Sequence, residues 1–283
     1  MKSNDFFALI EPTAPMAYSK EFCSRYGAYD NSGLLLDCGN EAHAAVFALD
    51  LSKDAVKAAE KAGAGVIVTH HPAIYSKLAS LSADDETGGA VLAAARAGIS
   101  VISMHLNLDA AEGGIDESLA RAVRAAGRKA AGKAAERCGE PTEERMFTFA
   151  CGNGAYGRAY DVADGAAVSA EALKEALDGM LGGRHTLLFA SEGKTVKRAA
   201  SFCGAGADEE AVAFAAKNGA DALISSDFKH HILKEAVARG MAVIAPTHYA
   251  SENYGFYQFY LKVQKIAGTA GVVCEYIENS ALL

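Results

Sequence analysis

The sequence predicts an α/β protein with an internal duplication. Short apolar runs rich in β-branched residues, typical of buried strands, alternate with alanine-rich segments that end at glycine, which is typical of helices. The order strand, helix, strand favours parallel strands joined by crossover helices. At 283 residues, the chain is long enough for one large domain or two modest ones.

The composition narrows the class of protein. A hydrophobic fraction of 51% and a charged fraction of 22% are typical of a globular protein that builds true cores. The net charge of −8 argues against nucleic acid as the main partner. The six cysteines contain no CxxC pair, so we expect reduced structural thiols. No signal-type segment or membrane-length apolar run occurs, so we expect a cytoplasmic protein without a membrane partner.

The first part of the chain carries alternating strands and helices. We expect helices over 18–26, 55–62, 90–97 and 116–126, and strands over 46–50, 66–68 and 99–104. Ser52 or Asp54 can cap the second helix, while Gly63 and Gly98 end the second and third. The Asp-Asn-Ser-Gly sequence at 30–33 is turn chemistry and predicts a loop.

The middle of the chain differs in character. Small and basic residues at 127–140 indicate a boundary. Beyond it we expect strands over 146–150, 155–162, 186–190 and 196–201, with a helix over 170–181. The resulting division is a first α/β lobe at 1–127, a linker and α+β segment at 128–200, and a second α/β lobe at 201–283.

Two pairs of segments indicate the duplication. Residues 55–69 align with 211–225, and residues 98–102 align with 240–244. Either match alone is weak, because alanine-rich helices resemble one another by chance. Two matches in the same order, each running on to a histidine, favour duplication over coincidence. If the two lobes pack about a pseudo-two-fold axis, their strand ends can face one shared cleft.

A pair of histidines ends the strand at 66–68. His70 and His71 follow the strand, and Pro72 then stops the ladder because proline has no N–H to donate. Ligands gather at the carboxyl ends of strands in α/β proteins, and two neutral imidazoles there are a natural start for a metal site. The alternative is that one histidine caps a backbone carbonyl and the other lies in solvent.

Further potential metal donors follow two other strands. His105 and Asp109 come after the strand at 99–104, and His248 and Glu252 are spaced to share one face of a helix. Imidazole and carboxylate suit Zn, Fe, Mn, Co or Ni, and the number of donors favours two ions. The alternatives are a turn role for Asp109, an exposed first-turn position for Glu252 and a hydrogen-bonded core position for His105.

Two other segments admit a functional interpretation that we consider the weaker one. His230 and His231 precede a helix-like stretch, so we expect them in its first turn rather than at a metal. Residues 204–206 lie before a helix starting near Asp208 and could hold a phosphate. Because acidic residues 208–210 already complement that helix dipole, plain capping is the favoured interpretation.

Five segments occur together in an order typical of one known family: Asp30–Leu34, Thr69–Pro72, His105–Ala110 with Gly113–Gly114, Ser225–Asp227, and Thr247–Glu252. Over nearly its whole length the chain resembles the Nif-three-like family (NGG-interacting-factor-like proteins), often labelled GTP cyclohydrolase 1 type 2. Tyr29 stands where that family often has Trp, and Ser225-Ser226-Asp227 replaces a common Thr-Gly-Asp or Thr-Gly-Glu. Neither departure touches the expected metal ligands.

The resemblance implies a fold of two similar, intertwined three-layer α/β/α lobes. It also implies two divalent transition-metal ions, whose ligands here would be His70, His71, Asp109, His248 and Glu252. Glu252 would bridge the ions, and His105 would lie beside them as a general acid/base or a supporting group. Assembly into a ring-shaped homohexamer is typical of the family.

The expected function is therefore that of a metal-dependent hydrolase acting on a small nucleotide or phosphoester-like substrate. The family label points to the purine ring of GTP. The alternative is a non-catalytic metal-binding scaffold or metal-handling protein that acts through partners. The sequence leaves open the metal, the substrate, the pathway and the roles of Asp227, His230 and His231.

Overall fold

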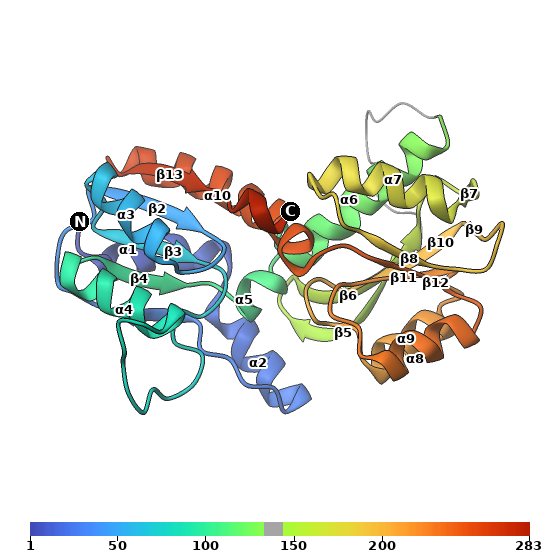
Figure 1. Ribbon diagram of the computed structural model, residues 1–283, viewed down its shortest axis with the longest axis horizontal. Helices are drawn as coiled ribbons and strands as arrows, with labels where there is room; N and C mark the ends of the chain where they lie inside the picture. The colour runs from blue at the N-terminus through green and yellow to red at the C-terminus, as the bar shows by residue number, and fades with distance from the viewer. Residues whose placement is uncertain (133–143) are drawn as a thin grey trace. The chain divides into compact units, whose positions relative to one another are not determined.

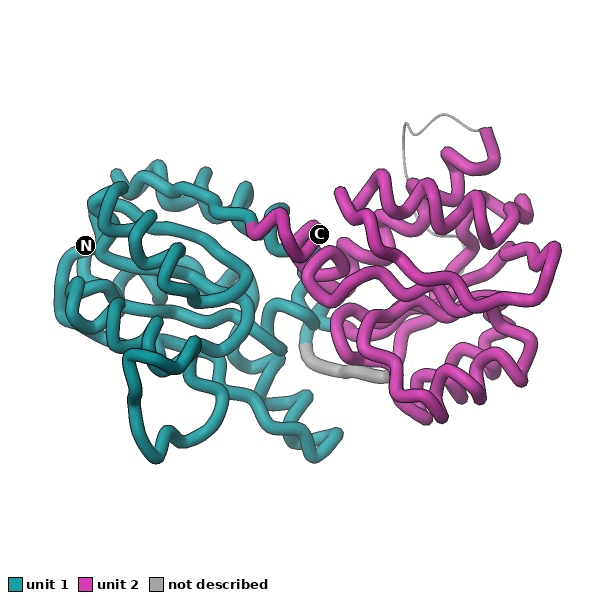
Figure 2. The backbone as a smooth tube through the Cα atoms, in the orientation of Figure 1, with its two compact units in different colours: residues 1–114, 150–154, 256–278 teal, residues 115–149, 155–255, 279–283 magenta. Residues whose placement is uncertain are grey.

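The computed structural model describes residues 1–132 and 144–283 (Figure 1). Its contacts divide the chain into two compact units, and Figure 2 shows that each is assembled from separate stretches of the sequence. Unit 1 comprises residues 1–114, 150–154 and 256–278, and unit 2 comprises residues 115–149, 155–255 and 279–283. No helix among the described residues has the length and apolar character needed to cross a membrane.

Unit 1 is built on a five-stranded sheet in the order β1-β4-β3-β2-β13. Its strands are β1 (Gly33–Leu36), β2 (Ala44–Ala48), β3 (Val66–Thr69), β4 (Ser100–Ser103) and β13 (Val273–Ile277). Four of them are parallel, and β1 runs antiparallel at one edge. Its helices are α1 (Ser3–Ile10), the 3-10 turn η1 (Glu11–Thr13), α2 (Met16–Tyr26), α3 (Lys53–Ala62), α4 (Glu86–Ala97), α5 (Leu106–Asp109) and the later turns of α10, from residue 256 onward.

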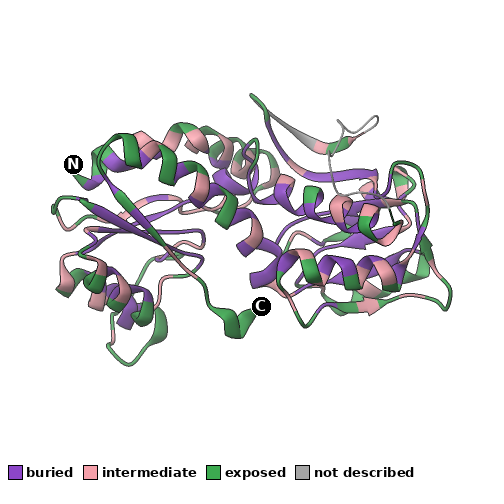
Figure 3. Ribbon diagram, turned by 90° about the horizontal axis from the view of Figure 1, so that it is seen from above, coloured by how far each residue is buried: buried purple, intermediate pink, exposed green. Residues whose placement is uncertain are grey.

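Helices cover both faces of the unit 1 sheet. Val46 and Ile67 pack against the apolar side of α3 and α4 on one face. Phe47, which points the opposite way because strand side chains alternate, packs against Phe256 and Phe259 of α10 (His248–Thr269), with ring centroids 6.3 and 6.1 Å away. The buried strands stand out in Figure 3.

Unit 2 contains a six-stranded sheet in the order β5-β6-β10-β11-β12-β8 and a small ladder of β7 with β9. Its strands are β5 (Arg145–Cys151), β6 (Gly154–Asp161), β7 (Val168–Ser169), β8 (Leu187–Phe189), β9 (Thr195–Val196), β10 (Arg198–Ser201), β11 (Ala222–Ile224) and β12 (Ala242–Ala245). Its helices are α6 (Ile115–Ala130), α7 (Ala170–Leu181), α8 (Glu209–Lys217), α9 (His230–Ala238), the first turns of α10, and the 3-10 turn η2 (Ser280–Leu282).

The predicted duplication is visible in the topology of the two sheets. The segment β2-α3-β3-α4-β4 of unit 1 corresponds to β10-α8-β11-α9-β12 of unit 2, and the strands of each segment are parallel. In each unit an antiparallel strand, β1 or β8, pairs with the last strand of the segment. The matched sequences 55–69 and 211–225 fall on α3-β3 and α8-β11. The fold is thus α/β with two similar β-α-β-α-β cores.

Local sequence signals explain several helix ends. The Ser52 hydroxyl accepts a hydrogen bond from the Ala55 N–H and caps α3, as predicted. Gly63 ends the same helix with a left-handed φ of 63°, which glycine adopts without a side-chain clash. Ser169 caps α7 in the same way through the Ala172 N–H.

The middle segment is organised differently from the expectation of a self-contained α+β insert. Strands β5, β6 and β8 from this segment pair into the main sheet of unit 2, at its two edges. Most of the small, basic stretch predicted at 127–140 lies outside the described residues, and its first four residues are the last turn of α6. The three-part division at residues 127 and 200 stays a prediction, because the compact units follow contacts rather than position in the sequence.

Two helical glycines should respond oppositely to alanine. A Cβ at Gly127 in α6 would lie 2.3 Å from the Val162 carbonyl oxygen, whereas one at exposed Gly268 in α10 would meet nothing within 4 Å. We expect Gly127→Ala to lower the free energy of unfolding by about 1–3 kcal/mol through overpacking. Gly268→Ala should raise it by about 0.5–1 kcal/mol through helix propensity. Denaturant titrations measure both values, and effects of the same sign would contradict the packing described for α6.

Candidate metal centre

The candidate donors of unit 1 come from the ends of two paired parallel strands. Thr69 of β3 pairs in register with Ser103 of β4, and their hydroxyls are hydrogen-bonded at 2.7 Å. The Met104 N–H donates to the Thr69 carbonyl at 2.8 Å, so the pairing continues one residue past the strand. This register delivers His70 and His105 to the same edge of the sheet, where ligands gather in α/β folds.

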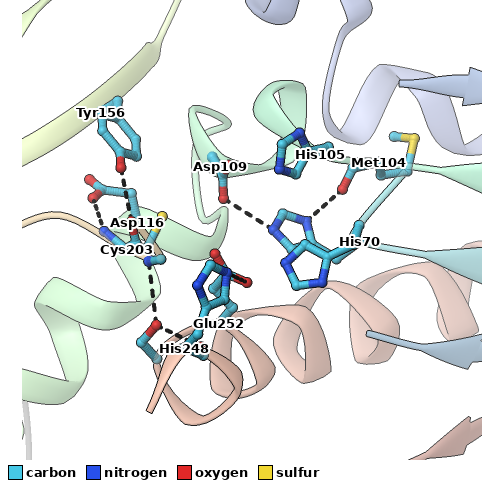
Figure 4. A network of polar contacts seen from close by, with 12 residues as sticks. His70, Met104, His105, Asp109, Asp116, Tyr156, Cys203, His248 and Glu252 are labelled. Atoms are coloured by element: carbon cyan, nitrogen blue, oxygen red, sulfur yellow. Dashed lines mark hydrogen bonds and ion pairs between the residues drawn. The ribbon is translucent and has the colours of Figure 1, made fainter. Parts of the chain in front are cut away.

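His70 is the most deeply buried of the histidines at this edge. Its side chain is 0% exposed, and its Nδ1–H donates to the Met104 carbonyl oxygen at 2.8 Å (Figure 4). Because a carbonyl only accepts, this bond requires a proton on Nδ1, so the neutral ring carries its lone pair on Nε2. Nε2 lies 3.5 Å from Oδ1 of Asp109, which is itself buried in α5.

Two further histidines stand beside His70. The ring centroid of His71 lies 4.9 Å from that of His70, and the ring centroid of His105 lies 5.2 Å from it. His71 donates from Nδ1 to Oδ1 of Asp50 at 2.6 Å, and His105 donates from Nδ1 to Oδ1 of Asp30 at 2.8 Å. In its neutral state, each of these rings therefore also carries its lone pair on Nε2.

The carboxylate that holds His105 is itself strongly held. Asp30 accepts hydrogen bonds from the hydroxyls of Ser19 and Ser32 as well as from His105. Burial alone would raise the pKa of Asp30, but these hydrogen bonds and the nearby His105 outweigh burial and lower the pKa to about 2. Asp30 is thus an ionised anchor that fixes the orientation of His105.

The candidate donors of unit 2 lie in the first two turns of α10. His248 donates from Nδ1 to Oδ2 of Asp227 at 2.6 Å, and its Nε2 lies 3.1 Å from Oε2 of Glu252. The expected sharing of one helix face by these residues is therefore observed. Glu252 is only 3% exposed, so the alternative of an exposed first-turn carboxylate is wrong.

A glycine allows the backbone to approach this pair. Gly204 has a φ of +55°, and a Cβ built there would lie 2.1 Å from Oε1 of Glu252 and 3.4 Å from Cε1 of His248. A side chain at this position would therefore displace the carboxylate. The Gly204 N–H donates to the Ser251 hydroxyl at 3.3 Å, which ties the loop to α10.

The donor chemistry and spacing fit a divalent transition metal. Each of the four histidines has its Nδ1 held by an oxygen acceptor, the arrangement by which a second group orients an imidazole ligand. In a tetrahedral site with metal–ligand bonds of 2.0–2.2 Å, neighbouring donors lie about 3.4 Å apart. The 3.5 Å separation of His70 Nε2 and Asp109 Oδ1 matches that value. Within unit 1, one ligand atom each from His70, His105 and Asp109 lie within 4.8 Å of one another.

The carboxylates that orient the histidines were not predicted from the sequence, which left the role of Asp227 open. Asp50 lies just after β2, Asp227 lies just after β11, and Asp30 belongs to the turn before β1. A usable signal existed, because each occurs near the end of a strand that neighbours a histidine-bearing strand. That signal is weak without pairing order, since aspartate is common in such turns.

The weaker functional interpretations of two other segments find no support in their surroundings. His230 and His231 are exposed at the start of α9, as predicted, and His231 Nε2 lies 3.1 Å from Oε1 of Glu209. Asp208 caps α8 by accepting a hydrogen bond from the Ala211 N–H at 2.8 Å. The favoured interpretation of plain capping at this helix is therefore confirmed.

The duplicated fold and the oriented histidines define an α/β protein with a candidate metal site. The family model for Duf34/NIF3 (NGG1p interacting factor 3) matches residues 1–280. The chain therefore belongs to the Duf34/NIF3 family, as its motifs predicted.

Individual relatives are distant. A Clostridium perfringens protein named GTP cyclohydrolase 1 type 2 homolog is 31% identical over 120 residues, covering 42% of this chain and 43% of that protein, so the match spans less than half of its length. A Helicobacter pylori protein named GTP cyclohydrolase 1 type 2 is 28% identical over 228 residues, covering 80% of this chain and 79% of that protein.

The structure of a Bacillus cereus protein related to NIF3 is similar with a TM-score of 0.76 at 17% identity, covering 98% of this chain and 97% of that chain. At that identity, the structural likeness shows a shared fold.

The lowered pKa of Asp30 generates a prediction about acid stability. Because its folded pKa of about 2 lies below the ordinary value of about 3.9, the unfolded chain binds more protons between these values. The stability that Asp30 contributes is thus complete above pH 4 and is lost as the pH falls toward 2. We expect Asp30→Asn to lower the free energy of unfolding by about 2 kcal/mol at neutral pH. The variant should also lose less of its stability than the wild type as the pH falls from 4 toward 2, here called the acid limb. Denaturant titrations across pH measure both effects, and exposed Asp84→Asn serves as the control; an unchanged acid limb in Asp30→Asn would contradict the assignment.

Proposed function

We propose that this protein is a metal-dependent hydrolase with a dinuclear centre that acts on a nucleotide or phosphoester-like substrate. The proposed ligands are His70, His71, Asp109, His248 and Glu252, with Glu252 as the bridging carboxylate. The observation that carries the proposal is that an oxygen acceptor holds the Nδ1 of each proposed histidine ligand, which leaves Nε2 as the metal-binding atom. Zn, Fe, Mn, Co and Ni all accept this donor set.

The proposed ligand set combines donors of both units, as the family resemblance implies. Within unit 1, Phe256 of α10 packs beside His70, with ring centroids 6.2 Å apart.

The chemistry divides between the ions and the chain. Bound divalent ions would lower the pKa of a water molecule and polarise the electrophile. His105, oriented by ionised Asp30, presents Nε2 as a proton acceptor beside His70. Its side chain is 20% exposed, so the ring remains reachable by a substrate.

The names of the relatives suggest the substrate class. The Helicobacter pylori relative is named GTP cyclohydrolase 1 type 2, and a purine nucleotide falls within the proposed class.

A non-catalytic metal-handling protein is the second candidate, favoured by the deep burial of His70 and Asp109. We also propose a homohexamer, the assembly that the family resemblance implies.

The metal content of purified protein tests the ligand assignment. We expect about two equivalents of transition metal per chain in the wild type. His71→Ala and Glu252→Ala should each lose at least one, because each removes a donor atom, whereas His230→Ala should lose none. Elemental analysis measures these values. A wild-type protein that holds no metal and takes up none of Zn, Mn or Fe would overturn the proposal.

The proposed role of His105 gives a second test. We expect His105→Gln to keep the wild-type metal content while hydrolysis of a nucleotide and phosphoester panel falls about 10²–10⁴-fold, since the proton acceptor is gone. Elemental analysis and product assays of the same preparations measure both. Loss of a metal equivalent would make His105 a ligand instead. A fully loaded wild type without turnover on the whole panel would favour the metal-handling alternative.

A further inference from the structure

One buried thiol lies beside the donors of unit 2. Cys203 follows β10, is 2% exposed, and has its Sγ within 4.8 Å of a carboxylate oxygen of Glu252. The next residue, Gly204, is the one whose missing side chain leaves room for Glu252 and His248. The thiol, the carboxylate and the imidazole are therefore contributed by two segments that lie against each other.

The backbone of Cys203 is held from both sides. Its N–H donates to Oδ1 of Asp116 at 3.3 Å, and its carbonyl accepts from the Tyr156 hydroxyl at 2.9 Å (Figure 4). The carbonyl also accepts from the Gly206 N–H at 3.2 Å. Asp116 is 0% exposed and accepts a second bond from the Gly157 N–H at 2.9 Å, so this anchor is itself fixed.

The residue after the thiol is tied to α10. The Gly204 carbonyl accepts from the Ser226 N–H at 3.0 Å and from the Ser225 hydroxyl at 3.1 Å. The Ser226 hydroxyl donates to that of Ser251 at 2.9 Å, and Ser251 adjoins Glu252 in α10. These bonds fix the position of the Cys203 thiol relative to the Glu252 carboxylate. A ligand that is held in place before the metal binds has its position fixed in this way.

We propose that Cys203 is a further metal donor, acting with His248 and Glu252 and making the centre selective for metals that accept thiolate. This inference rests on the proposed function and names the class of metal. On binding, the Cys203 S–H bond breaks, the sulfur lone pair forms the metal–sulfur bond, and the proton leaves to solvent. Zn, Fe and Co accept a thiolate donor, whereas Mn prefers oxygen donors.

A second buried cysteine provides a matched control. Cys274 in β13 is 6% exposed, and burial raises the pKa of its thiol to about 11. Its carbonyl accepts from the Tyr260 hydroxyl at 3.2 Å. Cys274→Ala therefore removes a buried thiol of similar exposure in unit 1 that has no place in the proposed site.

The test is a cobalt titration of the metal-stripped protein, followed by near-ultraviolet absorption and cobalt content. A sulfur-to-cobalt charge-transfer band should appear in the wild type and in Cys274→Ala. It should be absent in Cys203→Ala and in the nearly isosteric Cys203→Ser, while both still bind cobalt. Competition with a zinc chelator should show zinc affinity falling roughly tenfold or more in Cys203→Ala, with manganese affinity within about twofold of wild type.

The outcomes separate this inference from the proposed function. Cobalt that binds to the wild type without the charge-transfer band would overturn the thiolate assignment and leave the metal-dependent hydrolase standing. A band that persists in both Cys203 variants would assign the sulfur donor to another residue and overturn the inference. Failure of the folded wild type to bind cobalt at all would overturn both proposals.

Discussion

The hydrogen bond from His70 Nδ1 to the Met104 carbonyl is the interaction on which the candidate site depends. It joins the residue after β3 to the residue after β4, so it exists only because those strands are parallel and in register. The same bond fixes the tautomer of a fully buried imidazole and directs its lone pair toward Asp109. The register of β3 and β4 thereby determines the orientation of Nε2 of His70. A shift of the register by one residue would reverse the side chains of the strand.

In both units an oxygen acceptor holds the Nδ1 of each candidate histidine, but the acceptors differ between the units. In unit 1, a backbone carbonyl and two aspartates accept from the histidine Nδ1 atoms, whereas in unit 2 Asp227 accepts from Nδ1 of His248. The loop at Gly204 approaches Glu252 so closely that a Cβ there would overlap the carboxylate. The two strand edges are similar in topology but carry different residues. The candidate donors of unit 1 are mainly imidazoles, and those of unit 2 include a carboxylate with a thiol nearby.

The sequence predicted the β-α-β-α-β cores because their signals are local, as with Ser52 and Gly63 at the ends of α3. His70, Asp109, His248 and Glu252 were found as candidate donors through spacing and motif. Asp50 was not found, since its relation to His71 depends on the pairing of β2 with β3. The place of 145–201 in the unit 2 sheet was also missed, because edge pairing is a long-range property that no local pattern encodes.

The passage of α10 from unit 2 into unit 1 has a consequence for biosynthesis. Unit 1 includes the first residues of the chain, yet its edge strand β13 and the aromatic rings that pack against Phe47 come from residues 256–278. During translation, this face of β2 therefore stays uncovered until residues 256–278 have emerged from the ribosome. Contacts between residues so far apart in the sequence slow folding and prolong the exposure of apolar surface. The nascent chain is thus exposed to aggregation through this surface until its final helix and strand are complete.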